Sequence, residues 1–234
     1  YVVILSGERT ALFLLFLNMF IIFLAIKKFR LHLLYITGFL IISFVALINL
    51  NSTYYERYYY NVADSFGILQ LTEGSKVEKL SIFDNDNNFS LVLFSRHHQD
   101  HYESAYKIFK NNILKGGGTK SYRYLCKKSE YKISSSSCST HPHNIAIQFL
   151  SELGILGFVF LIFFHLLICR DFMKIIKLQN NEKFQLFLIF SLVGVIINIF
   201  PLIPSGNFFN NWLSVIFTLN LVNYIYLRQK YLND

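Results

Sequence analysis

The sequence predicts an all-α membrane protein, a multi-pass bundle of helices with one long loop on a single side of the bilayer. Hydrophobic residues make up 53% of the chain and charged residues only 15%, whereas about a quarter of the residues in a soluble domain are charged. The chain also contains uncharged runs of the length that a spanning helix needs, about 20 apolar residues. Lysine and arginine are concentrated in alternate connections between these runs, which is typical of membrane topology.

The uncharged runs predict five spans, at residues 8–26, 32–51, 145–168, 184–202 and 209–227. The last two come from one run that is too long for a single helix and that is interrupted by the sequence PLIPSGN at Pro201–Asn207. The opening YVVIL, without an initiating Met, is expected to be the stub of an earlier helix in a longer protein. The predicted organisation is therefore two transmembrane helices within 1–51, a loop at 52–143, and three transmembrane helices with a tail at 144–234.

The short loops predict the orientation of the chain. The basic ones contain Lys27, Lys28, Arg30, Arg170, Lys174, Lys177, Lys183, Arg228 and Lys230, whereas Pro201–Asn211 contains no Lys or Arg. The positive-inside rule places the basic loops and the C-terminal tail in the cytoplasm and residues 52–143 on the outer face. The net charge of +8 is then a consequence of topology. Since no basic stripe with interleaved aromatic residues accompanies it, we expect no nucleic-acid partner.

The first part of the outer loop gives few structural signals. Tyr54–Tyr60, YYERYYY, is typical of an interfacial aromatic belt, with a glycan-stacking platform as the alternative. Residues 62–94 give no readable fold. Asp84-Asn85-Asp86 has the D-x-D form of metal-dependent nucleotide-sugar transferases, but no α/β pattern surrounds it, and a solvated turn is the better interpretation.

An amphipathic helix is predicted at residues 96–114. Its apolar positions are Tyr102, Ala105, Tyr106, Phe109 and Ile113, which share one helical face. With Lys107 and Lys110 beside that face, we expect the helix to lie along the membrane surface and to end at the glycines of Lys115–Thr119.

The first turn of this helix has a metal-binding alternative. It is rich in polar side chains, namely His97, His98, Asp100 and His101, and His97 and His101 are one turn apart. A wet, polar first turn is the ordinary explanation of such a group, and we predict no metal site.

Two of the three cysteines precede the third predicted span. Cys126 and Cys138 fall on the outer face, where disulfides persist. A disulfide between them would stabilise the folded protein by about 3 kcal/mol on the chain-entropy estimate. Two free thiols are the alternative. Cys169 falls at the cytoplasmic end of a span and has no predicted partner.

Chemistry is expected at the outer rim of the membrane. Candidate side chains gather there, namely Glu8, Arg9, Arg96, Arg123, His141 and His143, and no charged residue is placed deep in a span, which argues against a transport path. His143 comes just before a predicted helix start, where the N-terminal partial positive charge disfavours imidazolium, so a neutral base is expected. A structural histidine is the alternative. The arginines could bind a diphosphate through bidentate bonds, or could anchor phospholipid headgroups.

One spacing is more specific than the rest. His143 and Asn144 are followed by nine residues and Gly154, then by two residues and Gly157. This pattern resembles the O-antigen ligase and O-antigen polymerase family of bacterial inner membranes. Weaker similarities are Ser6–Ala11 (SGERTA), Arg96, Gly116–Gly118 and the P-x-x-P-S-G turn at Pro201–Gly206.

The resemblance implies a membrane glycosyltransferase with a C-type fold and a periplasmic loop. Such enzymes take a glycan from undecaprenyl diphosphate and pass it to an acceptor hydroxyl, without a metal or other cofactor. His143 corresponds to the catalytic histidine, with Glu8 as a reserve base, and Arg9 and Arg96 correspond to diphosphate-binding arginines. The family often has the pattern Arg-x-x-x-Leu at this arginine, whereas this chain has Phe13 at the position of the leucine. The resemblance therefore supports a role for Arg9 less strongly than it supports one for His143.

Two readings of the resemblance stay open. A ligase passes the glycan to the lipid A core, whereas a polymerase extends a glycan on the same lipid carrier, and both share these motifs. A lipid-linked-glycan flippase or a non-catalytic membrane scaffold is the alternative from another class. The expected partners are the lipid-linked donor, one of these two acceptors and the phospholipid bilayer.

Overall fold

The computed structural model describes residues 2–60, 69–71, 77–79, 96–135, 137–177 and 182–231. The D-x-D sequence at Asp84–Asp86 lies outside these residues. Helices account for most of the described chain, and its two short strands pair antiparallel, with Leu69 opposite Lys79. The elements are α1 (Val2–Leu5), α2 (Arg9–Ala25), η1 (Lys27–Phe29), α3 (Arg30–Leu50), α4 (Ser52–Tyr55), η2 (Glu56–Tyr60), β1 (Leu69–Leu71), β2 (Val77–Lys79), α6 (Arg96–Asn111), α7 (Tyr122–Leu125), α8 (Ile145–Lys177), α9 (Glu182–Asn198) and α10 (Asn211–Tyr231).

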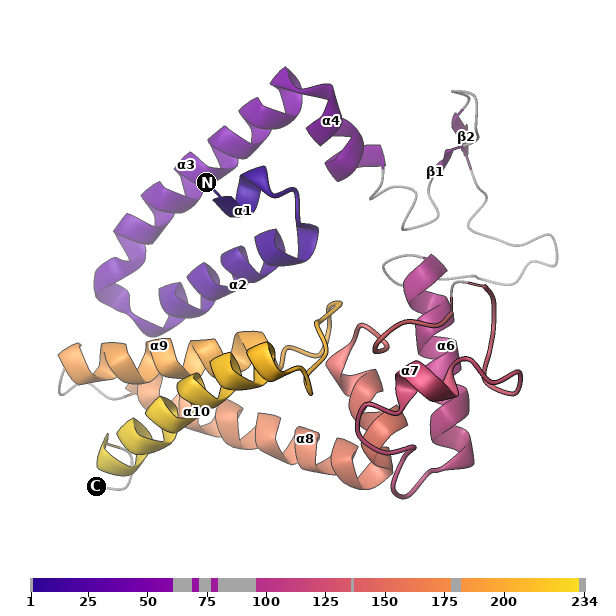
Figure 1. Cartoon of the computed structure of the whole chain (residues 1–234). Helices are drawn as coiled ribbons and strands as arrows, with labels where there is room; N and C mark the ends of the chain where they lie inside the picture. The colour runs from indigo at the N-terminus through magenta and orange to yellow at the C-terminus, as the bar shows by residue number, and fades with distance from the viewer. Residues whose placement is uncertain are drawn as a thin grey trace.

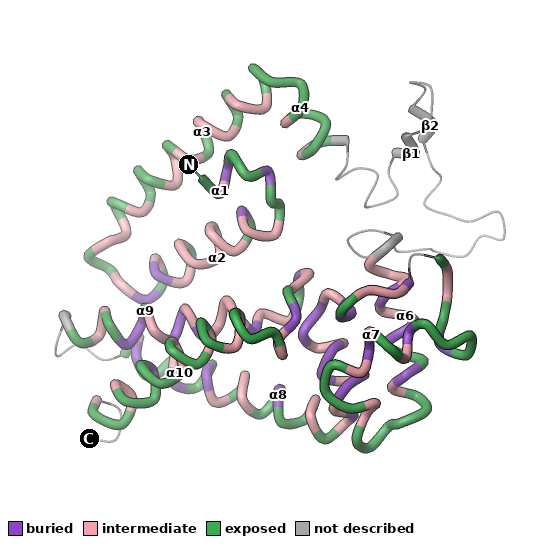
Figure 2. The backbone as a smooth tube through the Cα atoms, in the orientation of Figure 1, coloured by how far each residue is buried: buried purple, intermediate pink, exposed green. Residues whose placement is uncertain are grey.

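The core of the bundle lies around α9. Helices α2 and α3 form a hairpin, α2 packs on α9, and α10 and α8 lie against α9 (Figure 1). The buried side chains at these contacts are aliphatic, and they include Ile22, Ala25, Ile168, Ile175, Leu188, Ile189, Leu192 and Val195. Figure 2 shows this buried layer on the inner faces of α8 and α9, while α3 and α10 are largely exposed.

Every predicted span coincides with a helix, and among the described residues two helices are long and apolar enough to cross a membrane. These two are Lys27–Leu50 and Ile145–Lys177, whereas α2 and the stretch Phe184–Asn198 are apolar but shorter. Helix α3 buries none of its residues in the protein, and Ile42 on it is 70% exposed. Large apolar side chains exposed in this number would be costly in water, and they indicate a lipid environment.

A buried acidic residue joins α8 to α10. Asp171 accepts a hydrogen bond from the Tyr224 hydroxyl at 2.6 Å and forms ion pairs with Arg170 at 2.9 Å and with Arg228. Removing one partner of such a buried group leaves the others uncompensated, which is strongly destabilising. The contact therefore holds the C-terminal part of α10 against α8.

The helix predicted at 96–114 is α6, and the face that it buries in the protein differs from the predicted apolar face. Ala105 and Ile108 are fully buried, whereas Tyr106 and Ile113 are 51% and 56% exposed. The buried face packs against α7 and α8. As a result, the polar residues His101 and Ser104 on this face are buried. The predicted apolar face and the buried face share Ala105, and the apolar pattern did not predict that His101 and Ser104 would be buried.

Helix α8 is kinked at Gly154, which has φ 68° and ψ −163°. The kink frees backbone groups that a straight helix would pair internally. Residues 113–118 pair them instead: Gly117 N–H donates to Ser151 O at 2.8 Å, Gly118 N–H to Glu152 O at 2.9 Å, and Ile155 N–H to Ile113 O at 2.8 Å. The glycine-rich segment thus completes the hydrogen bonding of the bent helix.

The two backbones approach too closely for side chains. A Cβ on Gly154 would lie 2.6 Å from Gly116 N and from the Leu114 carbonyl group, and a Cβ on Gly116 would lie 2.5 Å from Gly154 N. A Cβ on Gly157 would lie 2.2 Å from the Cβ of Leu153. Both glycines of the His-Asn-x9-Gly-x-x-Gly pattern are therefore explained by the kink.

A second, smaller core holds the segment after α6. Ala105, Ile108, Tyr122, Cys126 and Tyr131 are buried together. A disulfide joins Cys126 to Cys138, with 5.2 Å between their Cα atoms. The Tyr122 hydroxyl donates to Ser137 O at 2.7 Å and lies 3.2 Å from His101 O. These contacts fix the chain that leads into His141 and His143.

We expect the disulfide to protect both cysteines in membranes prepared without reductant. Neither Cys126 nor Cys138 should react with a maleimide until the bridge is reduced, whereas the exposed Cys169 should react in permeabilised membranes in both states. Cys126→Ser should lower stability by about 3 kcal/mol, the entropic estimate for a loop of this size. Labelling of Cys126 before reduction, followed by mass spectrometry, would contradict the bridge.

Candidate functional site

One cavity of about 1230 Å³ collects polar side chains from segments far apart in the sequence. Its walls come from the corner between α1 and α2, from α4 and η2, from the start of α6, and from the segments at 141–143 and 200–206. The polar lining consists of Glu8, Arg9, Thr10, Thr53, Glu56, Arg57, His98, His141, His143 and Ser205. The apolar lining consists of Phe13, Phe200, Leu202, Ile203 and Pro204.

The backbone conformation of His143 and its hydrogen bonds position this residue in the cavity. It has a φ of 57°, in the left-handed region that residues other than glycine rarely adopt. Its carbonyl accepts a hydrogen bond from Ser205 N–H at 2.8 Å. Asn144 follows at the helix start, where its Oδ1 accepts from Ile147 N–H at 3.1 Å as an N-cap. An unusual backbone held by tertiary contacts is frequent at functional sites.

The side chain of His143 lies among three other imidazole rings. The ring centroids of His141, His101 and His98 lie 4.1, 5.2 and 5.6 Å from that of His143. The pKa of His143 is lowered to about 4, mainly by burial and in addition by the neighbouring histidines. This lowered pKa favours the neutral state predicted for His143, and its main cause is burial rather than the helix N-terminus.

His141 has a structural role beside it. Its Nε2 lies 3.1 Å from Ser205 O, and since a carbonyl oxygen only accepts, Nε2 carries the proton. Nδ1 then accepts from the Thr140 hydroxyl at 2.9 Å. The ring nitrogens of His143, by contrast, make no hydrogen bond with the described part of the chain. Of the two histidines around Pro142, His143 is thus the one with a nitrogen available to a substrate.

A polar stripe on α8 fixes the segments around His143. Asn144 Nδ2 donates to Pro201 O at 2.8 Å, and Gln148 Nε2 donates to Asn207 Oδ1 at 2.8 Å. Glu152 is fully buried, and its carboxylate accepts from the backbone N–H groups of Lys120 at 3.0 Å and Tyr122 at 3.3 Å. The stripe therefore ties the 201–207 turn and the start of α7 to α8.

The expectation that no charged residue lies deep in a span needs correction at Glu152. This residue falls within the predicted span 145–168, and backbone donors surround it rather than a transport path. The sequence analysis did not single out Gln148 and Glu152, which fix the segments around His143. Their spacing from Asn144, at i+4 and i+8 in an apolar helix, was the signal that could have found them.

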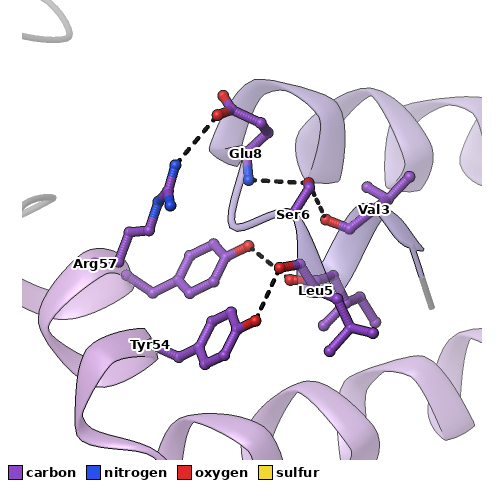
Figure 3. A network of polar contacts seen from close by, with 8 residues as sticks. Val3, Leu5, Ser6, Glu8, Tyr54 and Arg57 are labelled. Atoms are coloured by element: carbon purple, nitrogen blue, oxygen red, sulfur yellow. Dashed lines mark hydrogen bonds and ion pairs between the residues drawn. The ribbon is translucent and has the colours of Figure 1, made fainter.

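The start of α2 brings further charged residues to the cavity. Arg9 is the first residue of α2, and Glu8 precedes it as the N-cap. Both line the cavity, and the Glu8 carboxylate is ion-paired with Arg57 at 3.2 Å (Figure 3). Arg57 was missed, because within YYERYYY it has the appearance of a residue in an interfacial belt. The sequence contains no signal that links it to Glu8.

The other two predicted arginines are placed differently. Arg96 begins α6, but its side chain lies outside what the structure describes. Arg123 lies in α7, where it is half-buried and where its charge helps to lower the pKa of His141, after the larger effect of burial. It is not among the residues that line the cavity. The structure thus brings together Glu8, Arg9 and His143, and leaves Arg123 outside that cavity.

The metal-binding alternative rested on His97 and His101, and the side chain of His97 lies outside the described residues. His98 and His101 lie next to His143, in the cluster of imidazole rings. Among the residues that the structure describes, no group of three or more His, Cys, Asp or Glu side chains is arranged to hold a metal ion.

Comparison with known proteins identifies the family of this chain. A family model described as O-antigen ligase matches residues 1–162, which include Glu8, Arg9, Arg57, the glycine-rich segment, His143 and both glycines of α8. The chain belongs to the O-antigen ligase family. No curated protein and no solved structure matches it significantly. Membership of the O-antigen ligase family and the two apolar helices make this a membrane protein of a glycosyltransferase-like family.

If His143 acts as the base in a glycan transfer, its low pKa predicts how the rate of this O-antigen ligase family member depends on pH. A base acts when it is neutral, so kcat/KM should change by less than about 1.5-fold between pH 7.5 and 5.5 and fall only as the pH approaches about 4. A histidine with the ordinary pKa of about 6.5 would lose about tenfold over the same interval. Initial rates at low donor concentration measure this. A tenfold fall by pH 5.5 would contradict the buried, neutral state.

Proposed function

We propose that this protein is an O-antigen ligase that transfers a glycan from undecaprenyl diphosphate to a sugar hydroxyl at the periplasmic face of the bacterial inner membrane. The cavity supports the proposal, because its polar lining contains Arg9, Arg57 and His143 while Phe13 and Leu202 belong to its apolar lining. A lipid diphosphate has the same two characters, a charged headgroup and an apolar chain.

A second, apolar pocket supports the same donor. It has a volume of about 170 Å³, shares Thr10, Phe200 and Ser205 with the cavity, and reaches Leu14 and Phe217 between α2, α9 and α10. Binding of the first isoprene unit there would bury apolar surface at about 25 cal/mol per Å². The diphosphate would then lie beside the arginines of the cavity.

The proposed reaction is a direct displacement at the anomeric carbon. His143 takes the proton of the acceptor hydroxyl, the new glycosidic bond forms, and the bond between the sugar and the diphosphate breaks with its electron pair going to the diphosphate. The leaving group gains negative charge, which the arginine side chains stabilise. The lipid diphosphate released is the natural final acceptor of the proton held by His143.

The membrane arrangement is part of the proposal. Five helices cross the inner membrane as a C-type glycosyltransferase bundle, residues 52–143 lie in the periplasm, and the C-terminus lies in the cytoplasm. The supporting observations are the basic residues in alternate loops and the position of the cavity, which opens beside residues that precede α2 and α8. In this arrangement a diphosphate headgroup is reached from the outer face.

Transfer from a purified donor tests the function directly. The protein in detergent, with a glycan on undecaprenyl diphosphate and a truncated lipid A core as acceptor, should form lipid A-linked glycan in the presence of a chelator. Absence of product with every lipid-diphosphate donor offered would refute the proposal. Loss of product only with the chelator would instead show that a metal is needed.

A deletion strain separates the ligase from a polymerase of the same family. Loss of all long glycans from lipid A, with polymer retained on its lipid carrier, is the result expected for the ligase. Lipid A carrying single repeats would identify a polymerase. The lipopolysaccharide ladder and the lipid-linked pool are both visible on gels after extraction.

A further inference from the structure

Arg57 and Glu8 lie on two segments of the cavity wall that are 49 residues apart in the sequence and that meet here (Figure 3). Its Nη2 donates to Glu8 Oε1 at 3.2 Å. The turn that carries it is docked on the first corner of the chain by two further contacts. Tyr54 Oη donates to Leu5 O at 2.8 Å, and Tyr58 Oη donates to Ile4 O at 3.3 Å. The position of Arg57 is therefore fixed by tertiary contacts on both sides of it.

Gly7 makes room for the Arg57 side chain. A Cβ at Gly7 would lie 2.8 Å from Arg57 Nε, 2.9 Å from Cδ and 3.0 Å from Cζ, and Gly7 itself has a φ of 69°. The guanidinium thus lies directly against the backbone of the corner, with the Glu8 carboxylate on its Nη2. Glycine is the residue that permits both this backbone conformation and this close approach.

The ion pair contributes little to stability. The side chains of Arg57 and Glu8 are 47% and 65% exposed, and exposed pairs of this kind contribute little or nothing measurable. Its effect is on orientation. Within the described part of the chain the guanidinium makes this one hydrogen bond, and a guanidinium has five N–H donors in a planar fork. The remaining donors belong to a side chain that lines the cavity.

We propose that Arg57 binds the diphosphate of the donor, and that Glu8 is the counter-ion that orients Arg57 rather than a base. This inference rests on the proposed function and names a further residue of its donor site. A fork that is already positioned can bind a diphosphate in a bidentate manner with less loss of side-chain freedom. The Glu8 carboxylate is ion-paired with Arg57, and His143 remains the base.

Binding of inorganic diphosphate, measured by calorimetry on the full chain in neutral detergent, tests the inference. Arg57→Ala should weaken binding by about tenfold or more, as expected for the loss of charge-assisted hydrogen bonds. Arg57→Lys should restore less than half of the affinity lost, because lysine keeps the charge but lacks the fork. Gly7→Ala should behave like Arg57→Ala, because its Cβ displaces the guanidinium. Lys107→Ala, on the exposed side of α6, is the matched control that should bind as the wild type does.

Glycan transfer separates the two roles of Glu8. Glu8→Gln keeps an oxygen that can accept from Arg57, so transfer should change by less than about threefold, whereas loss of a base would cost about 10² or more. A loss of that size in Glu8→Gln would overturn the inference. Unchanged diphosphate binding by a folded Arg57→Ala variant, or no binding by the wild type, would overturn it too.

Two further experiments test whether the anion is a diphosphate or a phospholipid headgroup, and distinguish failure of the inference from failure of the proposed function. Phosphatidylglycerol at the same concentration should not displace the diphosphate, and displacement would make Arg57 a phospholipid anchor and overturn the inference. His143→Ala should keep diphosphate binding and lose transfer. If the wild type binds diphosphate through Arg57 but transfers no glycan, the proposed function fails and the inference stands.

Discussion

His143→Ala is expected to reduce glycan transfer by a factor of about 10² to 10⁴, the usual contribution of a general base. The reason is geometric as well as chemical. His143 lines the cavity, it is neutral because burial lowers its pKa to about 4, and its ring nitrogens are bonded to nothing in the described chain. Donor binding should persist, since the diphosphate is assigned to arginines. The measurement is initial transfer rate and diphosphate affinity on the same detergent sample.

The control for this substitution is His32→Ala. His32 is an exposed histidine near the start of α3, outside the residues that line the cavity, and its loss should change transfer by less than about twofold. His141→Ala should fall between the two. It removes the donor to Ser205 O and the ring packed 4.1 Å from that of His143, so it acts through the position of the base. Near-normal transfer by a folded His143→Ala variant would refute the general-base role.

Gly154→Ala is expected to lower stability by about 2 to 6 kcal/mol and to abolish transfer. Two costs add. The backbone conformation of Gly154 belongs to a region that is essentially restricted to glycine and costs another residue about 1–3 kcal/mol. The new Cβ would also lie 2.6 Å from Gly116 N and the Leu114 carbonyl, and such overpacking costs about 1–3 kcal/mol. Thermal unfolding in detergent measures the combined effect.

Two other glycines separate these costs. Gly118 has a φ of 101° but no atom within 4 Å of a Cβ, so Gly118→Ala should show the conformational cost alone. Gly38, inside α3, has neither a positive φ nor a neighbour within 4 Å, and Gly38→Ala should be neutral or stabilising by up to about 1 kcal/mol. If Gly154→Ala is no worse than Gly118→Ala, the close approach of the two backbones is not needed for folding.

Much of the helical architecture was predictable from the sequence because bilayer thickness imposes a length on apolar runs. The five predicted spans coincide with α2, α3, α8, α9 and α10 to within a few residues, except that α8 continues nine residues further, to Lys177. The break at Pro201–Asn207 was equally visible, because proline and glycine interrupt an apolar run. The stripe of α6 was predicted less well, since apolar spacing does not reveal which polar residues a partner helix will bury.

The site was predictable only in part. The sequence by itself determined that His143 precedes a membrane helix, that Asn144, Gly154 and Gly157 follow at the spacing typical of the family, and that Arg9 starts another helix. These are local properties, set by residue type and by position along one helix.

The tertiary structure alone decided which distant residues share the cavity with His143. It pairs Glu8 with Arg57 and places His98 and His101 beside His143. It leaves Arg123 outside the cavity lining. It also shows that the close approach of two backbones requires glycine at Gly154 and Gly116. The physical reason is that these contacts depend on how the segment before α2, the η2 turn, α6 and α8 pack on one another. The apolar lengths that define the helices carry no information about that packing, because the same spans could be arranged in many ways.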